Sequence, residues 1–180
     1  MNHIMLDLET MGTNPNAAIV AIGAVAMDFD TNKIGPTFYQ TIMLESSMQS
    51  GGIVDGSTVA WWMKQGEQAR QEIYKAENQL SPTLLAFADF IKGISSHDDI
   101  RVWGDGAAFD NVILASSYRR LSLPLPWKYW NDRCYRTMKK LYNDVKTEPV
   151  GIEHNALDDA MSQALHLLAI YKSKNLGRKS

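Results

Sequence analysis

The chain has 180 residues, of which 45% are hydrophobic and 21% charged, and its formal net charge is −2 with a pI near 6.1. This length and composition are those of one folded domain with a real hydrophobic core. Tight binding to duplex DNA usually needs a broad basic face, which this charge balance does not supply. No apolar stretch reaches the roughly 18 residues of a membrane span, so we expect no membrane partner.

The N-terminal residues lack the basic segment and the apolar run of a signal peptide. Cys134 is the only cysteine, so the chain cannot form an internal disulfide, which is typical of a reducing compartment. We therefore expect a cytoplasmic protein. No repeat, low-complexity tract or linker divides the sequence, and we expect a single domain over residues 1–180, with a core at about 4–172 and a frayed tail at 173–180.

Three strands are predicted at the start of the chain. Residues 4–9 alternate toward their end, and residues 18–27 form an apolar run that favours a buried strand. Residues 28–33 are turn-like, and residues 35–44 alternate again as a paired strand would. These three segments predict an antiparallel meander.

Helices and short strands then alternate. Helices are predicted at 57–63 and 67–75, and another begins at Ser81-Pro82 and ends at Gly93, because proline is tolerated in a first helical turn. Further predictions are a strand at 100–103, a helix at 109–121, a strand at 128–132, a helix at 134–142, a loop at 143–153 and a helix at 155–172. This order favours an α/β fold with a mixed sheet, in which three antiparallel strands precede parallel strands and helices cover the faces.

Asp7-Leu8-Glu9 lies in the first predicted strand. Residues two apart in a strand share a face, so both carboxylates point to one side while Leu8 enters the core. Neighbouring carboxylates repel each other unless a cation joins them, and a hard cation such as Mg²⁺ prefers oxygen ligands. The alternative is a strand end with solvated acids.

Two further acidic groups follow at helix starts. Asp110 comes after the small residues of 104–108, where an aspartate is also a common helix N-cap. In 154–160, Asn155 can cap the last helix, with Asp158 and Asp159 in its first turn. Capping does not require His154, which precedes the cap at the end of a loop and could act as a base near neutral pH.

Together the three segments resemble the DnaQ-like 3′–5′ exonucleases of the DEDDh subgroup, whose motifs are D-x-E, F-D and H-x-A-x-x-D-A. Here these are Asp7-Leu8-Glu9, Phe109-Asp110 and the segment from His154 to Ala160. The resemblance covers about residues 4–170 and is closest to small bacterial and phage members labelled exodeoxyribonuclease VIII or exoribonuclease. It implies a ribonuclease-H-like fold. One departure is Asp105, where those members often have a neutral residue, and we expect it to close a turn rather than add a metal ligand.

The resemblance implies a two-metal mechanism with Mg²⁺ or Mn²⁺. Asp7, Glu9 and Asp159 would hold one ion, and Asp7 and Asp110 the second. His154 would be the general base, and Asp158 would serve the helix cap. Nucleoside 5′-monophosphates would leave one at a time from the 3′ ends of single-stranded DNA or RNA.

Substrate contacts are implied around the first and second motifs. The backbone at Thr10, Met11 and Gly12, together with Phe109, would line the pocket of the terminal nucleotide. Trp61 and Trp62 are candidates for base stacking, and since both cannot face the same way on a helix, we expect one to be buried and one to lie near the substrate. The basic residues Arg119, Arg120, Arg133, Arg136, Lys139 and Lys140 either contact phosphates or form solvated helix faces.

Three alternatives remain open from the sequence. The substrate could be DNA, RNA or very short oligonucleotides, because recognition of a 2′-OH depends on pocket geometry. A catalytically inactive nucleic-acid-binding module on the same fold would lack a ligand or the base, yet all five positions are filled. A purely structural domain, with acids that only cap helices, would bind neither Mg²⁺ nor Mn²⁺. A homodimer is compatible with the resemblance, since small relatives are often dimers.

Overall fold

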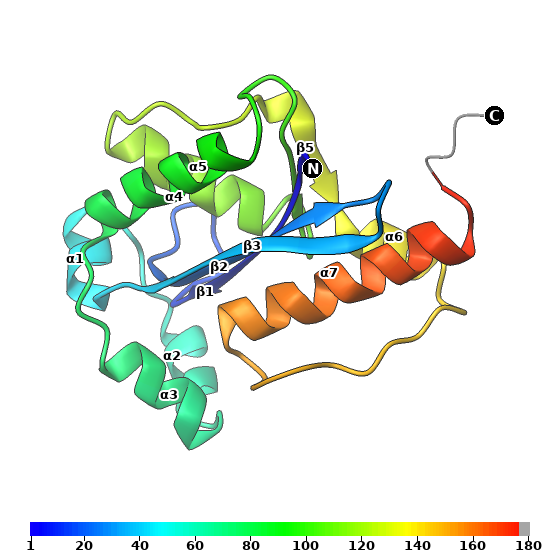
Figure 1. Ribbon diagram of the computed structural model, residues 1–180. Coiled ribbons are helices and arrows are strands. Elements are labelled where there is room, and N and C mark those ends of the chain that lie inside the picture. Colours follow the sequence, from blue (N-terminus) through cyan, green and yellow to red (C-terminus); the bar gives the residue numbers. More distant parts are fainter. Residues whose placement is uncertain (177–180) are drawn as a thin grey trace.

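A computed structural model describes residues 1–176 and shows one five-stranded sheet with the strand order β3-β2-β1-β4-β5 (Figure 1). The strands β1 (His3–Thr10), β2 (Ile19–Asp28) and β3 (Lys33–Thr41) form the predicted antiparallel meander. The strand β4 (Arg101–Gly104) pairs parallel with β1, and β5 (Asp132–Cys134) pairs parallel with β4. The mixed sheet expected from the sequence is confirmed.

Helices cover both faces of this sheet (Figure 1). Its helices are α1 (Leu44–Gln49), α2 (Gly56–Trp62), α3 (Glu67–Tyr74), α4 (Leu80–Ile94), α5 (Asp110–Arg120), α6 (Tyr135–Leu141) and α7 (Ala156–Ser173). One apolar cluster joins α4 and α5 to the sheet, and a second joins α6 and α7 to the opposite face. Because β2 is covered on both sides, its residues from 19 to 27 are all buried, which explains its continuous apolar sequence.

The structure corrects two sequence predictions in the interior of the chain. The strand predicted to end at residue 44 ends at Thr41, and α1 follows. This helix has only six residues, two of which are serines, so it shows no apolar periodicity from which it could be predicted. The strand predicted at 128–132 is a 3₁₀ turn at Tyr129–Asn131, and β5 lies after it. The physical reason is that residues far away in sequence hold this segment, because Asn131 donates to the carbonyl of Asp98 and Asp132 accepts from Asn111.

The end of the chain also differs from its prediction. Ser173 is still helical, and residues 174–176 form a turn with backbone hydrogen bonds back to α7. The rest of the predicted frayed tail, 177–180, lies outside the described residues. Within residues 1–176, no helix is both long and apolar enough to cross a membrane.

Two glycines allow helix starts to approach the middle of the sheet. A Cβ on Gly23 would lie 2.1 Å from the carbonyl of Ala156, so α7 begins in direct contact with β2. A Cβ on Gly104 would lie 2.5 Å from Oδ1 of Asn111 and 3.0 Å from the side chain of Asp110, so α5 begins against the end of β4. Since Gly23 pairs with Asp7, both helix starts come close to the acidic end of β1.

Candidate active site

The four acids singled out in the sequence are contributed by three elements. Asp7 and Glu9 share one face of the central strand β1, while Leu8 between them is buried in the opposite core cluster. Asp110 is the first residue of α5, where its carboxylate accepts a hydrogen bond from the backbone N–H of Leu8. Asp159 lies in the first turn of α7. Residues far apart in sequence are therefore brought to one cavity, which all four acids line.

Burial and mutual repulsion raise the pKa values of these carboxyl groups. Burial raises the pKa of Asp7, and the negative charges of Asp110, Glu9 and Asp159 raise it further. Burial is also the largest cause for Glu9, whose pKa rises to about 9 with contributions from Asp159 and Asp110. The pKa values of Asp110 and Asp159 are raised in the same direction by burial. Such a group of oxygen ligands suits a hard divalent cation, which would stabilise the charged forms.

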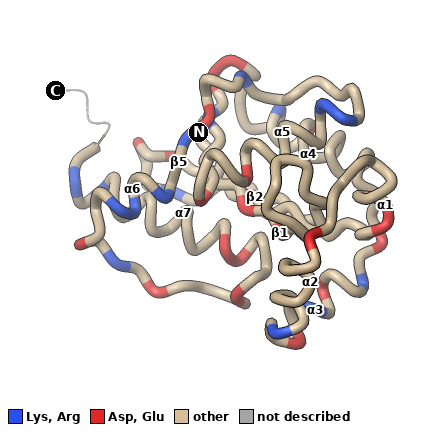
Figure 2. The backbone as a smooth tube through the Cα atoms, turned by 180° about the vertical axis from the view of Figure 1, so that it is seen from behind, with Lys and Arg blue, Asp and Glu red and all other residues tan. Residues whose placement is uncertain are grey.

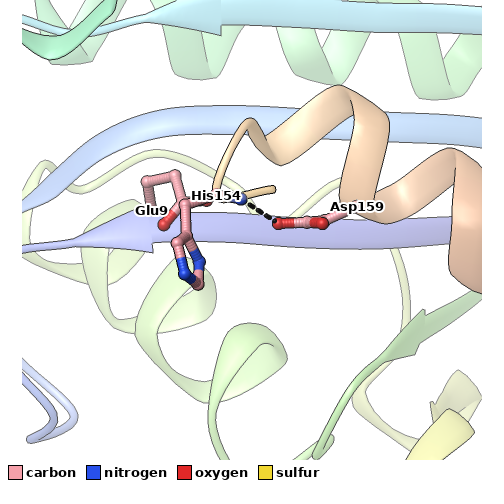
Figure 3. A group of neighbouring side chains, drawn as sticks. All are labelled: Glu9, His154 and Asp159. Atoms are coloured by element: carbon pink, nitrogen blue, oxygen red, sulfur yellow. Dashed lines mark hydrogen bonds between the residues drawn. The ribbon is translucent and has the colours of Figure 1, made fainter. Parts of the chain in front are cut away.

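His154 points toward this acidic group from the end of the loop before α7 (Figure 3). Its backbone N–H donates to Oδ2 of Asp159 over 2.9 Å, and its ring lies edge-on to Trp61 at 4.8 Å between ring centroids. One ligand atom each from Glu9, His154 and Asp159 lies within 4.8 Å of the other two. The histidine is therefore placed where it can either exchange a proton with a water at the acids or bind a cation.

One stripe of α7 secures the loop that carries His154. Asn155 caps the helix as predicted, since its Oδ1 accepts from the backbone N–H groups of Leu157 and Asp158. Asp158 is a partner of this cap through its backbone N–H, as predicted, and its side chain has a separate role, since its Oδ2 accepts from the N–H of Ile152 over 2.7 Å. Two more side chains bind the loop, at four and eight residues after Asp158. The hydroxyl of Ser162 bonds with the N–H and the carbonyl of Val150, and His166 bonds with the carbonyl of Val145.

Gln163 is a site residue that the sequence analysis missed. Its Nε2 donates to Oδ1 of Asp7 over 2.7 Å, and this bond lowers the pKa of Asp7 against the larger opposing effect of burial. Its Oε1 is buried and has no hydrogen-bond partner among residues 1–176. The available signal was spacing, because a residue four positions after Asp159 lies on the same face of a helix.

Asp105 lies in the turn between β4 and α5, at the opposite side of the same cavity. Its carboxylate contacts Nε of Arg136 at 3.3 Å and Nζ of Lys139 at 3.4 Å. The expectation of a turn residue is confirmed, and the structure adds that this acid faces two cations on α6.

Two cavities adjoin at the acidic group. The larger, of about 820 Å³, contains all four acids and His154, and the smaller, of about 420 Å³, lies beside Glu9 and is shared at Leu8, Glu9 and Phe109. Most of the residues that were expected to contact substrate line the smaller cavity, namely Thr10, Gly12, Trp61, Trp62 and Phe109. Met11 is not among them, since its side chain is buried in a small apolar cluster with Trp62 and Val20.

The tryptophan pair is divided as expected. Trp62 is only 5% exposed, and its Nε1 donates to the carbonyl of Thr10 over 2.9 Å. Trp61 is 43% exposed and lies between the smaller cavity and His154. The buried tryptophan therefore fixes the backbone after the first motif, and the exposed one is available to a ligand.

Comparison with known proteins agrees with this arrangement. The family described as "3'-5' exoribonuclease Rv2179c-like domain" matches residues 2–171. An exodeoxyribonuclease of Enterobacteria phage T4 is 26% identical over 200 residues, which cover 92% of this chain and 87% of the phage protein.

Solved structures share the fold at low sequence identity. The nuclease domain of 3′hExo, a DEDDh family member bound to rAMP, is similar with a TM-score of 0.63 and 15% identity over 97% of this chain and 92% of that domain. Exonuclease I of E. coli in complex with a dT13 oligonucleotide has a TM-score of 0.61 and 16% identity over 97% of this chain and 41% of its own. The chain thus belongs to the Rv2179c-like family of 3′–5′ exonucleases, and it shares its fold with the DEDDh family member 3′hExo.

Proposed function

We propose that this exonuclease is metal-dependent and removes nucleoside 5′-monophosphates, one at a time, from the 3′ ends of single-stranded DNA or RNA. The observation that carries the proposal is the convergence of Asp7, Glu9, Asp110, Asp159 and His154 on one cavity. Four acids with raised pKa values are costly to ionise in the absence of a cation, so binding of divalent metal gives them a function.

The acids divide between two proposed cation positions. Asp7, Glu9 and Asp159 would hold one Mg²⁺ or Mn²⁺, and Asp7 and Asp110 would hold the second. When bound, the two ions supply the positive charge that stabilises phosphodiester hydrolysis. Oxygen-only donors in a partly enclosed site are consistent with these metals.

His154 is proposed as the general base. An imidazole nitrogen would take the proton of the attacking water, which then attacks the scissile phosphorus, and the 3′ oxygen of the shortened strand leaves. The hydrogen bond that the backbone N–H of His154 donates to Asp159 supports this role, and so does the edge-on contact of the ring with Trp61. Both contacts hold the histidine beside the acids. Proton transfer by a positioned histidine contributes typically about 10²–10⁴-fold to a rate.

The smaller cavity is the proposed pocket for the terminal nucleoside. Trp61 offers a flat face for stacking, which tolerates any base. Glu9 lies at the junction of both cavities, where its carboxylate can accept a hydrogen bond from a free 3′-OH. Thr10 and Gly12 contribute the wall that Trp62 holds in place. Met11 contributes only through its backbone in this proposal.

The proposal is tested by digesting 5′-labelled single-stranded DNA and RNA of equal sequence with Mg²⁺, with Mn²⁺ and with EDTA. A ladder that shortens from the 3′ end only with metal is expected, and the faster ladder identifies the preferred sugar. Absence of cleavage by folded, metal-bound protein would favour the inactive binding module instead. The same preparation, examined by sedimentation equilibrium, tests the homodimer suggested by small relatives.

A further inference from the structure

The two adjoining cavities differ in their charged residues. No Lys or Arg within residues 1–176 lines the smaller cavity, whose walls are apolar, aromatic and hydroxyl-bearing. The larger cavity is lined by three cations, Arg136 and Lys139 from α6 and Lys146 from the loop after it. The acids that we propose as metal ligands line the larger cavity, and Glu9 lies where the two cavities join.

The cationic side is exposed and only partly neutralised. Arg136 and Lys139 keep about half of their side-chain surface exposed, and both face the single carboxylate of Asp105. Lys146 lines the same cavity from the exposed loop that follows α6. Figure 2 shows basic residues along α6 and in the segment that follows it. One acid thus faces two cations, and a third cation lines the same cavity.

The structure also separates these residues from the other basic candidates. Arg120 donates to the carbonyl of Ser50 and to the hydroxyls of Ser116 and Ser117, and Arg133 donates to the backbone carbonyls of Trp130 and Asp132. The hydrogen bonds of these two arginines are therefore made within the fold. Neither they nor Arg119 and Lys140 line the two cavities.

We propose that Arg136, Lys139 and Lys146 bind the phosphates of the strand on the 5′ side of the bond that is cut. The inference rests on the proposed function and adds the path of the strand. A terminal nucleoside carries no phosphate beyond the scissile one, so a pocket without cations suits it. Each further nucleotide on the 5′ side adds one negative charge, which requires cations along its path. The strand therefore runs from α2, across the acids, toward α6.

This path predicts a dependence on the length of the substrate. A substrate with nothing on the 5′ side of the scissile phosphate cannot reach α6, so it gains nothing from the three cations. A longer strand places additional phosphates beside them, and its binding then weakens with salt as counterions are released.

The test compares the Lys139→Ala/Lys146→Ala variant with the matched Lys140→Ala/Lys172→Ala variant, which removes two exposed lysines that do not line the larger cavity. Arg136 stays in place, because its guanidinium packs over Gly106 and contacts the turn at Asp105. Two substrates are used: thymidine 5′-monophosphate p-nitrophenyl ester, which has no 5′-side phosphate, and 5′-fluorescein-labelled dT12. Binding of dT12 is measured by anisotropy with Ca²⁺, and gels verify that the strand stays intact.

We expect the Lys139→Ala/Lys146→Ala variant to hydrolyse the ester as the wild type does, while its Kd for dT12 at low salt rises about fivefold. The slope of log Kd against log salt should fall by about 1.4, which is the contribution of two phosphate contacts to a single strand. An equal loss on both substrates, an unchanged Kd, or the same change in the control variant would overturn the inference. Failure of the wild type to hydrolyse either substrate would instead overturn the proposed function.

Discussion

His154 adopts a backbone conformation that few residues other than glycine favour. Its φ is +64°, in the left-handed region, where a side chain with a Cβ is strained. The backbone bond to Asp159 and the contact with Trp61 hold this conformation and direct the ring toward the acids. At this location the ring could act as a base or as a metal ligand. If it is the base, metal binding does not depend on the ring, whereas if it is a ligand, metal binding does.

The His154→Ala variant separates these two roles. We expect kcat to fall by about 10²–10⁴-fold because proton transfer is lost, while Mn²⁺ affinity measured by calorimetry stays close to that of the wild type. A parallel loss of Mn²⁺ affinity would identify the histidine as a ligand. The Glu77→Ala variant is the control, since this exposed side chain lines neither cavity and its removal should leave kcat unchanged.

Gln163 orients the carboxylate of Asp7 from the opposite side. Replacement by leucine keeps the bulk and removes the amide donor, so we expect Mn²⁺ affinity to fall about tenfold, as is usual when a partner of a metal ligand is lost. At saturating metal, kcat of Gln163→Leu should return toward the wild-type value. A kcat that stays low with unchanged Mn²⁺ affinity would show that Gln163 acts on the substrate rather than through Asp7.

Among the elements, α7 contributes to the larger cavity through two stripes of side chains. One stripe presents Asp159 and Gln163 to the acids of β1, and the neighbouring stripe, at residues 158, 162 and 166, binds the loop before the helix. His166 also accepts from the hydroxyl of Tyr135, whose pKa is raised by burial, so the same stripe ties α6 to the loop. A displacement of α7 would therefore move acids, base and loop together.

The sequence predicted this helix and the acid, Asp159, that it brings to the cavity, but not the second stripe. Periodicity located α7, and the spacing from His154 selected Asp159 rather than Asp158, because both signals are local. The partner of Asp158 is a loop held by side chains of α7, and an apolar pattern does not show which polar side chains of a helix bind a loop. The β5 strand was misplaced because Asn131 and Asp132 are held by Asp98 and Asn111, which lie elsewhere in the fold. The importance of Gly23 was equally hidden, because its contact is with a helix more than a hundred residues away.

Gly23→Ala tests the contact between β2 and α7. The added Cβ would meet the carbonyl of Ala156, which is backbone and cannot move aside without shifting the start of α7. We expect a loss of stability of about 1–3 kcal/mol from overpacking and a larger fall in kcat/KM, since Asp159 moves away from β1. The measurements are thermal unfolding and hydrolysis of the thymidine ester.

The matched control is Gly93→Ala on α4. Nothing lies within 4 Å of a Cβ at this position, and alanine is the better helix former by up to about 1 kcal/mol. This variant should be as active as the wild type and no less stable. If Gly23→Ala behaved in the same way, the close approach of α7 to the sheet would not be what positions the acids.

At the scale of the whole molecule, the acids of the site make stability depend on pH and metal. In the metal-free protein Glu9 keeps its proton up to a pKa of about 9, whereas in the unfolded chain the pKa is 4.5. Between these values the folded state binds more protons than the unfolded state, so the free energy of unfolding falls as pH rises. The contribution is complete at low pH and is lost as pH rises through about 9.

Half-buried His3 acts in the opposite direction at lower pH. Burial lowers its pKa from 6.5 to about 4, so between these values the unfolded state binds more protons and stability rises with pH. Above pH 7 this histidine is neutral in both states and contributes no slope. The window from pH 7 to 9 therefore excludes His3, and the carboxyl groups of the site act there against Cys134, whose lowered thiol pKa makes stability rise with pH.

We expect the Tm of the metal-free protein in EDTA to fall from pH 7 to pH 9. One retained proton contributes at most about 1.4 kcal/mol per pH unit, and about 1 kcal/mol corresponds to a shift of about 2–4 °C for a protein of this size. With saturating Mg²⁺ the fall should be smaller or reversed, because the cation takes the place of the protons and binds the ionised acids. Glu9→Gln should flatten the EDTA curve, whereas Glu77→Gln, at an exposed position outside both cavities, should leave it unchanged. A Tm that does not change between pH 7 and 9 in EDTA would mean that these acids are already ionised in the metal-free fold, so that their repulsion is relieved by something other than protons.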